Sequence, residues 1–160
     1  MSSERIKILV KHPFPPLLVR FYIGAIFVYA SLHKINFPAE FSDNIASYLI
    51  VPYWLVNPTA VFLPWIELIS GVCLIAGIRV RASVSIICGL LALFTIAVII
   101  VLIRKTPIDC GCFNNVGDPV SWLTAGRDII WLAMGLYVYK YDSLIHLDRL
   151  FMVKPEELNP

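Results

Sequence analysis

Apolar and polar residues alternate along the chain in long blocks, and four apolar blocks are long enough to cross a membrane. A spanning helix needs roughly 20 mostly apolar residues, because the hydrocarbon core is about 30 Å thick and each residue rises about 1.5 Å. The blocks cover about residues 17–35, 60–78, 82–103 and 122–139. The pattern predicts an all-α integral membrane protein, a four-helix bundle that forms a single membrane domain over residues 1–160.

Helix-breaking residues lie between these blocks. Pro38 ends the first predicted helix, and Asn57-Pro58-Thr59 starts the second. The segment Arg79–Arg81 leaves room only for a hairpin between the second and third helices. The segment Thr106–Ser121 contains two prolines and two glycines and is typical of a loop. The chain between the helices therefore alternates from one side of the membrane to the other.

A shorter segment between the first two spans has a different pattern. Between Phe41 and Leu55, apolar residues recur at roughly helical spacing with polar residues between them. This pattern predicts a short amphipathic helix in the membrane interface, and a packed loop is the alternative.

Composition and charge support the membrane interpretation. The chain is 59% hydrophobic and 15% charged, whereas a soluble domain usually has about 25% charged residues. The net charge is only +2, so we expect the lipid bilayer as a partner and no nucleic acid.

The positive charges are distributed unequally between the two sides of the predicted bundle. Cytoplasmic loops usually collect Lys and Arg. One side carries Arg5, Lys7, Lys11, Arg20, Arg79, Arg81, Lys140, Arg149 and Lys154, and the other carries Lys34, Arg104 and Lys105. Both termini are therefore predicted to be cytoplasmic, and the loop before the fourth helix is predicted to face the periplasm or the cell exterior. Arg20 is expected to extend toward the lipid headgroups.

The outward loop contains a Cys-Gly-Cys triplet, Cys110 to Cys112. A disulfide between these residues closes a very small ring, and strained, exposed disulfides are easily reduced. The triplet therefore favours thiol–disulfide exchange, with a static disulfide or a soft-metal site as alternatives. Cys73 and Cys88 lie inside the second and third helices, where small apolar side chains pack at helix contacts.

Charged residues within spans are costly and often mark function. Lys34, Glu67, Arg127 and Asp128 fall at similar depth below the outward loop, and we expect Glu67 to pair with Arg127. Such a cluster could move protons or bind the head of a membrane-soluble cofactor, or it could only fix helix register.

Aromatic residues lie close to this charge cluster in the sequence. Trp65 and Trp122 are expected either to form part of an interfacial belt or to flank a quinone ring. A metal site built from His33, Cys110 and Cys112 lacks a fourth ligand, so no metal is expected.

Several of these motifs together resemble the MauE/DoxX family of redox-associated membrane proteins, over about residues 17–139. The second predicted helix is similar to a Pro-x-x-Glu-x-x-x-Gly pattern that begins at Pro64. The most specific part is Cys110-Gly111-Cys112-Phe113 followed by Arg127-Asp128, and Asn114 departs from the glycine common at its position. The first-helix part of the resemblance rests on Arg20, Gly24 and His33-Lys34.

This resemblance implies a four-helix bundle in the bacterial inner membrane and a role in periplasmic thiol–disulfide chemistry. The implied partner is a thioredoxin-like or disulfide-containing protein, and a quinone is the implied electron acceptor. In this interpretation Cys110 and Cys112 exchange electrons, Arg127 stabilises negative charge on the acceptor, and Glu67 or Asp128 handles protons. The alternatives are a small carrier for a soft metal ion and a non-catalytic assembly scaffold.

Overall fold

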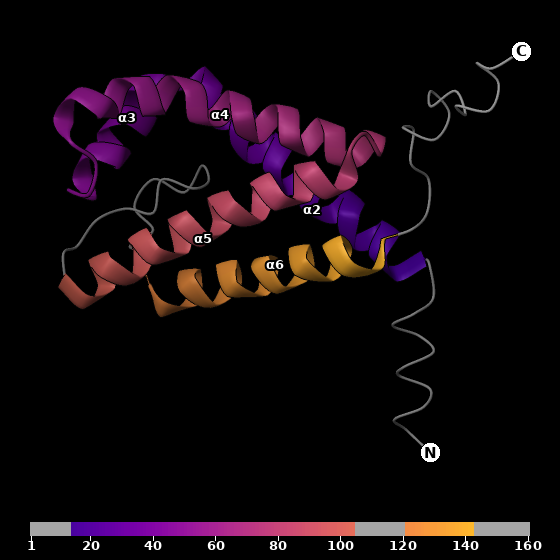
Figure 1. The fold of residues 1–160 in the computed structure, drawn as a ribbon. Helices are drawn as coiled ribbons and strands as arrows, with labels where there is room; N and C mark the ends of the chain where they lie inside the picture. The colour runs from indigo at the N-terminus through magenta and orange to yellow at the C-terminus, as the bar shows by residue number, and fades with distance from the viewer. Residues whose placement is uncertain (1–13, 105–120, 143–160) are drawn as a thin grey trace, which may run out of the picture.

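The structure is a computed structural model that describes residues 14–104 and 121–142. The described residues form α2 (Phe14–Asn36), α3 (Pro38–Ser47), α4 (Tyr53–Ala76), α5 (Val80–Arg104) and α6 (Trp122–Tyr141), and none of them lies in a strand. The all-α prediction is confirmed. The helices α2, α4, α5 and α6 are long, and α3 is the short element between the first two of them (Figure 1).

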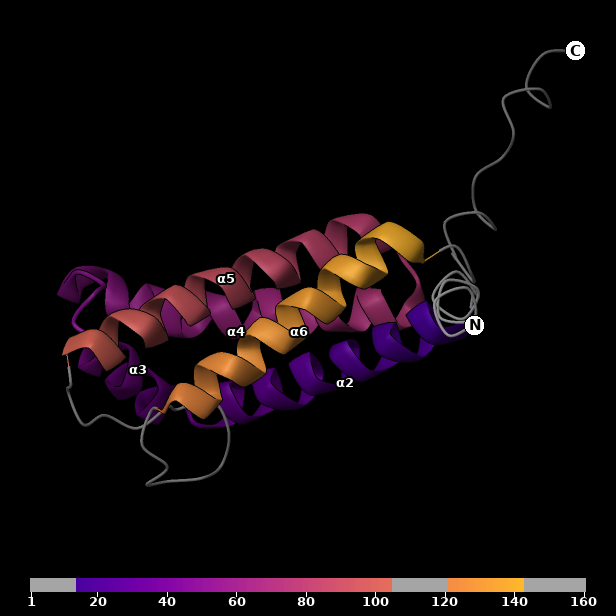
Figure 2. The ribbon, with the colours of Figure 1, turned by 90° about the horizontal axis from the view of Figure 1, so that it is seen from below.

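The four long helices pack in a ring. Helix α2 packs against α4, α4 against α5, α5 against α6, and α6 closes the ring against α2. Consecutive long helices run in opposite directions, as Figures 1 and 2 show. The start of α2, the turn between α4 and α5, and the end of α6 therefore lie together at one end, which we call the terminal end. The α3 end contains α3, the end of α5 and the start of α6.

The start of α4 and the end of α3 differ most from their sequence predictions. Helix α4 begins at Tyr53 and continues through Pro58 and Pro64, whereas the sequence placed its start at Asn57. Neighbouring helices and local adjustments make internal prolines tolerable in membrane helices. The predicted amphipathic helix also ends earlier, because α3 stops at Ser47 and Tyr53 already belongs to α4.

The hairpin between α4 and α5 is closed by a left-handed residue, Gly77, whose φ is 76°. Its N–H lies within hydrogen-bonding reach of the Cys73 and Leu74 carbonyls, and the N–H of Ile78 donates to the Cys73 carbonyl at 2.9 Å. This is the usual way in which a helix satisfies its last carbonyls before a tight turn. The predicted hairpin is confirmed, with its connecting residues at 77–79, two positions earlier than Arg79–Arg81.

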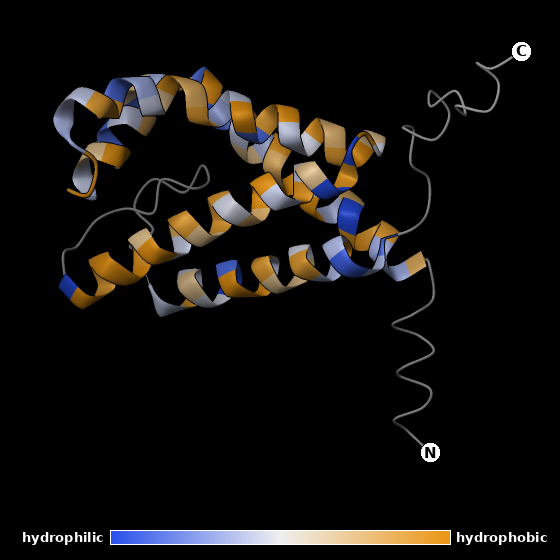
Figure 3. Ribbon diagram, viewed as in Figure 1, coloured by the Kyte–Doolittle hydropathy of each residue, from blue (hydrophilic) through white to orange (hydrophobic). Residues whose placement is uncertain are grey.

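The bundle has the polarity of a membrane protein. Helices α2, α4 and α5 are, among the described residues, the three that are long and apolar enough to cross a membrane. The fourth predicted span corresponds to α6, which is less apolar because it contains Arg127, Asp128 and Lys140. Large apolar side chains such as Leu93 and Leu123 are exposed while Arg20, Glu67 and Asp128 are buried. Apolar residues predominate along the long helices in Figure 3.

Candidate functional site

A cavity of about 360 Å³ lies toward the α3 end of the bundle. All five described helices contribute to its wall, and most of the lining side chains are apolar, including Phe27, Leu91 and Phe94. Ligand sites in proteins typically have this character, with volumes of about 300–1,000 Å³ and a few polar groups that orient the ligand. The polar and charged residues of this wall are Lys34, Asn44, Tyr48, Thr59, Glu67, Arg127 and Asp128.

The first charged group of the wall is an ion pair between α2 and α4. The Lys34 ammonium donates hydrogen bonds to both carboxylate oxygens of Glu67, at 2.8 and 2.7 Å. The two side chains are 12% and 9% exposed, and Lys34 also lies 5.1 Å from the centre of the Phe41 ring. The predicted pairing of Glu67 with Arg127 is therefore wrong. Helices α2 and α4 pack directly on each other, so the last turn of α2 delivers Lys34 to the carboxylate.

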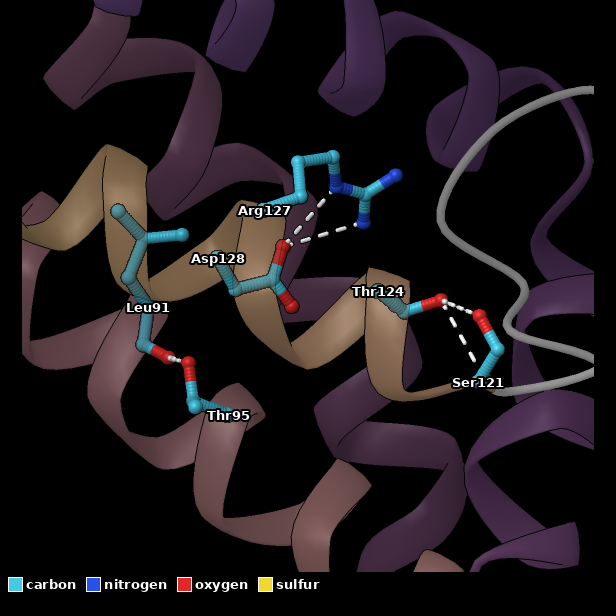
Figure 4. A network of polar contacts seen from close by, with 6 residues as sticks. All are labelled: Leu91, Thr95, Ser121, Thr124, Arg127 and Asp128. Atoms are coloured by element: carbon cyan, nitrogen blue, oxygen red, sulfur yellow. Dashed lines mark hydrogen bonds and ion pairs between the residues drawn. The ribbon is translucent and has the colours of Figure 1, made fainter.

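The second charged group belongs to α6 alone. The Arg127 guanidinium donates from Nε and Nη2 to Oδ1 of Asp128, at 3.2 and 3.1 Å (Figure 4). The guanidinium also lies 4.7 Å from the centre of the Trp131 ring. The Asp128 side chain is 1% exposed, and its Oδ2 atom has no hydrogen-bond partner among the described residues.

The start of α6 is fixed about two turns before this pair. Ser121 and Thr124 form a capping box, in which the Ser121 N–H donates to the Thr124 hydroxyl at 3.4 Å (Figure 4). Such caps satisfy the free N–H groups of a helix start. The cap stabilises the first turn of α6, the helix that carries Arg127 and Asp128.

Tyr48 is a cavity residue that sequence reasoning did not single out as functional. It follows α3, is 8% exposed, and packs with Val98 of α5 and Ala125 of α6. Burial, followed by the negative charge of Asp128, raises its pKa to about 12. No sequence signal distinguishes Tyr48 from the other tyrosines, because only the fold brings the end of α3 to α5 and α6.

Comparison with known proteins assigns the family. The profile of the family described as "Methylamine utilisation protein MauE" matches residues 13–140, which cover all the described helices except the last residue of α6. The chain belongs to the MauE family. This confirms the resemblance to MauE that the motifs indicated.

Individual MauE proteins are similar at moderate identity. "Methylamine utilization protein MauE" of Methylorubrum extorquens is 34% identical over 122 residues, which is 75% of this chain and 66% of the relative. The proteins of the same name from Paracoccus denitrificans and Methylophilus methylotrophus are 32% and 31% identical over 75% and 81% of this chain, and 66% and 70% of their own lengths. The chain thus spans just under two thirds of the first two relatives. No solved structure matches it.

The two cysteines of the predicted redox pair in this MauE-family chain, Cys110 and Cys112, lie outside the described residues. The helices on either side are described: α5 ends at Arg104, α6 begins at Trp122, and both boundaries lie at the α3 end (Figure 1). The Cys-Gly-Cys segment is therefore connected at both sides to the end of the bundle that holds the cavity.

The other two cysteines of this MauE-family chain are free. Cys88 packs against α6 at Gly135, where an added Cβ would lie 2.6 Å from the sulfur. This is the helix-contact role predicted for it. The described residues contain no group of three or more His, Cys, Asp or Glu side chains that could hold a metal ion.

The remaining predicted site residues of the MauE-family chain lie on the outer surface of the bundle. Trp65 is half exposed and Trp122 is exposed, and neither lines the cavity, whereas Trp131 does.

Arg20 was expected at the lipid headgroups, and this expectation is wrong. Its guanidinium is 3.0 Å from the Asp142 carboxylate at the terminal end, and both side chains are 1% exposed. Sequence reasoning missed this pair because its members are 122 positions apart.

Proposed function

We propose that this chain is a membrane thiol–disulfide redox protein that transfers electrons from a thiol partner to a quinone through Cys110 and Cys112. The observation that carries the proposal is the apolar cavity with two ion pairs, which lies at the end of the bundle to which the Cys-Gly-Cys segment is connected. An apolar wall suits a membrane-soluble ring, and a few polar groups suit its oxygens.

The residues of the cavity fit a quinone head. Lys34 is balanced by Glu67 and Arg127 by Asp128, so these four groups carry no net formal charge and favour an uncharged ligand. Nearby aromatic side chains, Phe94 and Trp131, offer ring faces for packing. A bound quinone would supply a two-electron, two-proton acceptor.

The electrons and protons of the thiol chemistry balance with the partner dithiol and the acceptor as the only reactants. A thiolate of a partner dithiol attacks one sulfur of the Cys110–Cys112 disulfide, which breaks and gives a mixed disulfide. The second partner thiol displaces the chain's sulfur, so the partner is oxidised and the cysteine pair gains two electrons and two protons. The pair then releases two electrons and two protons to the acceptor and returns to a disulfide.

The residues of the two ion pairs have different roles in this scheme. Arg127 stabilises negative charge on the acceptor oxygens, because a guanidinium in an apolar cavity is poorly screened. Both oxygens of Glu67 are engaged by Lys34, whereas Oδ2 of Asp128 has no hydrogen-bond partner among the described residues. We therefore assign proton handling to Asp128 and the positioning of the cavity wall to the Lys34–Glu67 pair.

The proposal also covers the cellular location of the chain and the metabolic process in which it takes part. We place the chain in the bacterial inner membrane with both termini cytoplasmic and the segment that contains Cys110 and Cys112 in the periplasm, because Lys and Arg collect on the side of the termini. The partner is then a periplasmic thioredoxin-like or disulfide-containing protein. The names of the similar proteins support a role in methylamine utilisation.

The test is a reconstituted reaction. The purified full chain in nanodiscs is mixed with reduced thioredoxin and a short-chain ubiquinone, and quinone reduction is followed by ultraviolet absorbance. We expect turnover with the wild type, none with Cys110→Ser or Cys112→Ser, and normal turnover with the matched control Cys73→Ser. A wild-type chain that produces no quinone-dependent thiol oxidation would contradict the proposal.

The two alternative functions give other results. A soft-metal carrier predicts that Cys73→Ser and Cys88→Ser alter growth in mercury or copper, which the redox proposal does not. A non-catalytic scaffold predicts that Cys110→Ser leaves the cellular process unchanged.

A further inference from the structure

The cavity wall on α5 continues from the interior of the bundle to its outer surface. Leu91 and Leu93 both line the cavity, although Leu91 is 5% exposed and Leu93 is 68% exposed. Residues two positions apart lie on nearly opposite sides of a helix. Leu90, which lies between them around the helix axis, is partly buried and completes this wall. The cavity therefore extends past α5 to the surface of the bundle.

This opening lies between α5 and α4. Cys88 marks the side of α5 that faces α6, because an added Cβ on Gly135 would lie 2.6 Å from its sulfur. Leu93 follows five positions later and so faces away from α6. The other neighbour of α5 in the ring is α4, whose Leu63 also lines the cavity. Leu63 and Leu93 therefore form the two sides of the opening.

The opening follows from the way in which α4 and α5 diverge. Near their hairpin, Leu74 of α4 belongs to the same buried cluster as Val84 and Leu91 of α5. The buried cluster at the α3 end contains Val98 and Val101 of α5 but, among the described residues, none from α4. The two helices separate toward the α3 end in Figure 1. The opening is thus a property of the helix arrangement and does not depend on one side-chain rotamer.

The opening lies at the level of the hydrocarbon core. Leu93 is eleven positions before Arg104, the last residue of α5, which places it about 16 Å from that end of the helix. Since the hydrocarbon core is about 30 Å thick, Leu93 lies near its middle. Ile66 of α4 and Ile96 of α5, on the outer surface nearby, are exposed and apolar. A group that passes through the opening therefore meets lipid tails.

The charged groups of the cavity lie on the other side. Lys34 belongs to α2, and Arg127 and Asp128 belong to α6, the two helices across the ring from the opening. Glu67 of α4 is turned toward α2, where it binds Lys34. A molecule that fills both the cavity and the opening would therefore have a polar head beside the ion pairs and an apolar chain toward the lipid.

We propose that the opening between α4 and α5 is a binding subsite for a hydrocarbon tail, so that the ligand of the cavity is a molecule with a compact polar head and a long apolar chain. The inference rests on the proposed function in that the head is a quinone. It goes further by assigning the tail as a recognised part of the ligand and Leu63, Leu90 and Leu93 as the residues that contact it.

The first test locates the tail by photolabelling of the full chain in nanodiscs. The probe is a ubiquinone analogue with an alkyl diazirine in its tail close to the ring, and the control probe is the same chain without the ring. We expect the quinone probe to label residues 59–67 of α4 and 90–97 of α5, and excess decylubiquinone to remove this label. The control chain should label the outer surface without such competition.

Other labelling patterns overturn the inference. Competed labelling of another segment, such as α3, would show that the tail leaves elsewhere. Labelling of the opening by both probes without competition would show that any hydrocarbon chain, including a phospholipid acyl chain, fills it. The first pattern leaves the proposed function intact, because the quinone head still binds. Absence of competed labelling, together with no binding of a tail-less ubiquinone, overturns the proposed function as well.

The second test narrows the opening with Leu93→Trp. Equilibrium binding of tritiated probes is measured on nanodiscs that hold the full chain, with empty nanodiscs as the blank, and thermal unfolding verifies that each variant is folded. We expect decylubiquinone binding to weaken roughly fivefold or more, the effect of overpacking, and binding of the tail-less ring to stay unchanged. Ile96→Trp, at an exposed residue of α5 outside the cavity, should match the wild type for both probes. Equal weakening of both probes, or unchanged decylubiquinone binding, overturns the tail subsite.

Discussion

Lys34 at the end of α2 donates to both carboxylate oxygens of Glu67 in α4, and this bidentate contact forms part of the cavity wall. It joins two helices that run in opposite directions and that also approach closely elsewhere. A Cβ on Gly24 would lie 3.1 Å from the Gly71 carbonyl oxygen, so the two backbones are almost in contact there. The pair therefore sits on a rigid interface, where loss of one partner leaves the other charge poorly compensated.

The first prediction concerns this ion pair. Glu67→Gln and Lys34→Met should each lower the free energy of unfolding by about 3 kcal/mol, because each leaves one charge in a mostly apolar environment. The double variant should lose less than the sum of the two, with a coupling of roughly 1 kcal/mol or more. Unfolding in mixed micelles measures these losses. The exposed Glu40→Gln is the control, with an expected change within about 0.5 kcal/mol. Strictly additive losses at Lys34 and Glu67 would contradict the contact.

The second prediction concerns the proton at Asp128. In the reconstituted reaction, Asp128→Asn should lower quinone reduction by about 10²-fold, the lower range for loss of a general acid or base. The first step, oxidation of the partner dithiol by the cysteine pair, should keep its rate in a single-turnover measurement. Asp43→Asn, an exposed change on α3, is the control. Equal slowing of both steps would assign Asp128 a purely structural role.

The third prediction concerns the terminal end. Arg20 and Asp142 form a buried pair that connects α2 to the residue that ends α6. Asp142→Asn should therefore lower the free energy of unfolding by roughly 3–5 kcal/mol. Lys140→Gln, two residues earlier and exposed, should change it by less than about 0.5 kcal/mol. If Asp142→Asn unfolds at the same denaturant concentration as the wild type, the pair contributes nothing to stability.

The fourth prediction concerns the contact between α5 and α6. Gly135→Ala places a Cβ 2.6 Å from the Cys88 sulfur, so we expect a loss of about 1–3 kcal/mol from overpacking. Cys88→Ala in the same chain should restore most of that loss, since it removes the sulfur. Gly89→Ala, where an added Cβ meets nothing within 4 Å, is the control and should not destabilise the protein. Failure of Cys88→Ala to rescue would place the strain elsewhere.

The fifth prediction concerns pH. Tyr48 has a pKa of about 12 in the folded protein and an ordinary value of 10.0. The folded state therefore binds this proton more tightly, and its stabilising effect is complete below pH 10 and is lost as the pH rises from 10 toward 12. Tyr48→Phe should lack this part of the alkaline loss of stability. Unfolding midpoints of wild type and variant, compared across that range, test this. Parallel curves would contradict the raised pKa.

The number and the approximate positions of the long helices could be predicted, because both depend on local properties of the chain. The lengths of the apolar blocks and the break at Pro38 identify helices without any knowledge of their partners. The start of α4 was misplaced at Asn57, because its internal prolines resemble helix starts in the sequence. In the structure, the surrounding helices make these prolines tolerable.

The pairing of the charges could not be predicted in this way. Depth along each helix predicted that Lys34, Glu67, Arg127 and Asp128 lie at a similar level, and in the structure all four line one cavity. Depth says nothing about which face of a helix meets which neighbour, and so Glu67 was paired with Arg127. In the ring of helices α4 packs against α2, and Glu67 therefore pairs with Lys34.

The sequence by itself therefore determined that the chain forms membrane helices, which residues are charged within them, and which family its motifs resemble, since each of these depends on composition and spacing along the chain. Only the tertiary structure decided that Arg20 is buried against Asp142 and that Tyr48 reaches between α5 and α6. Both contacts join segments far apart in the sequence. They exist because packing of the four helices leaves these polar groups inside the bundle, where each must lie beside a suitable partner.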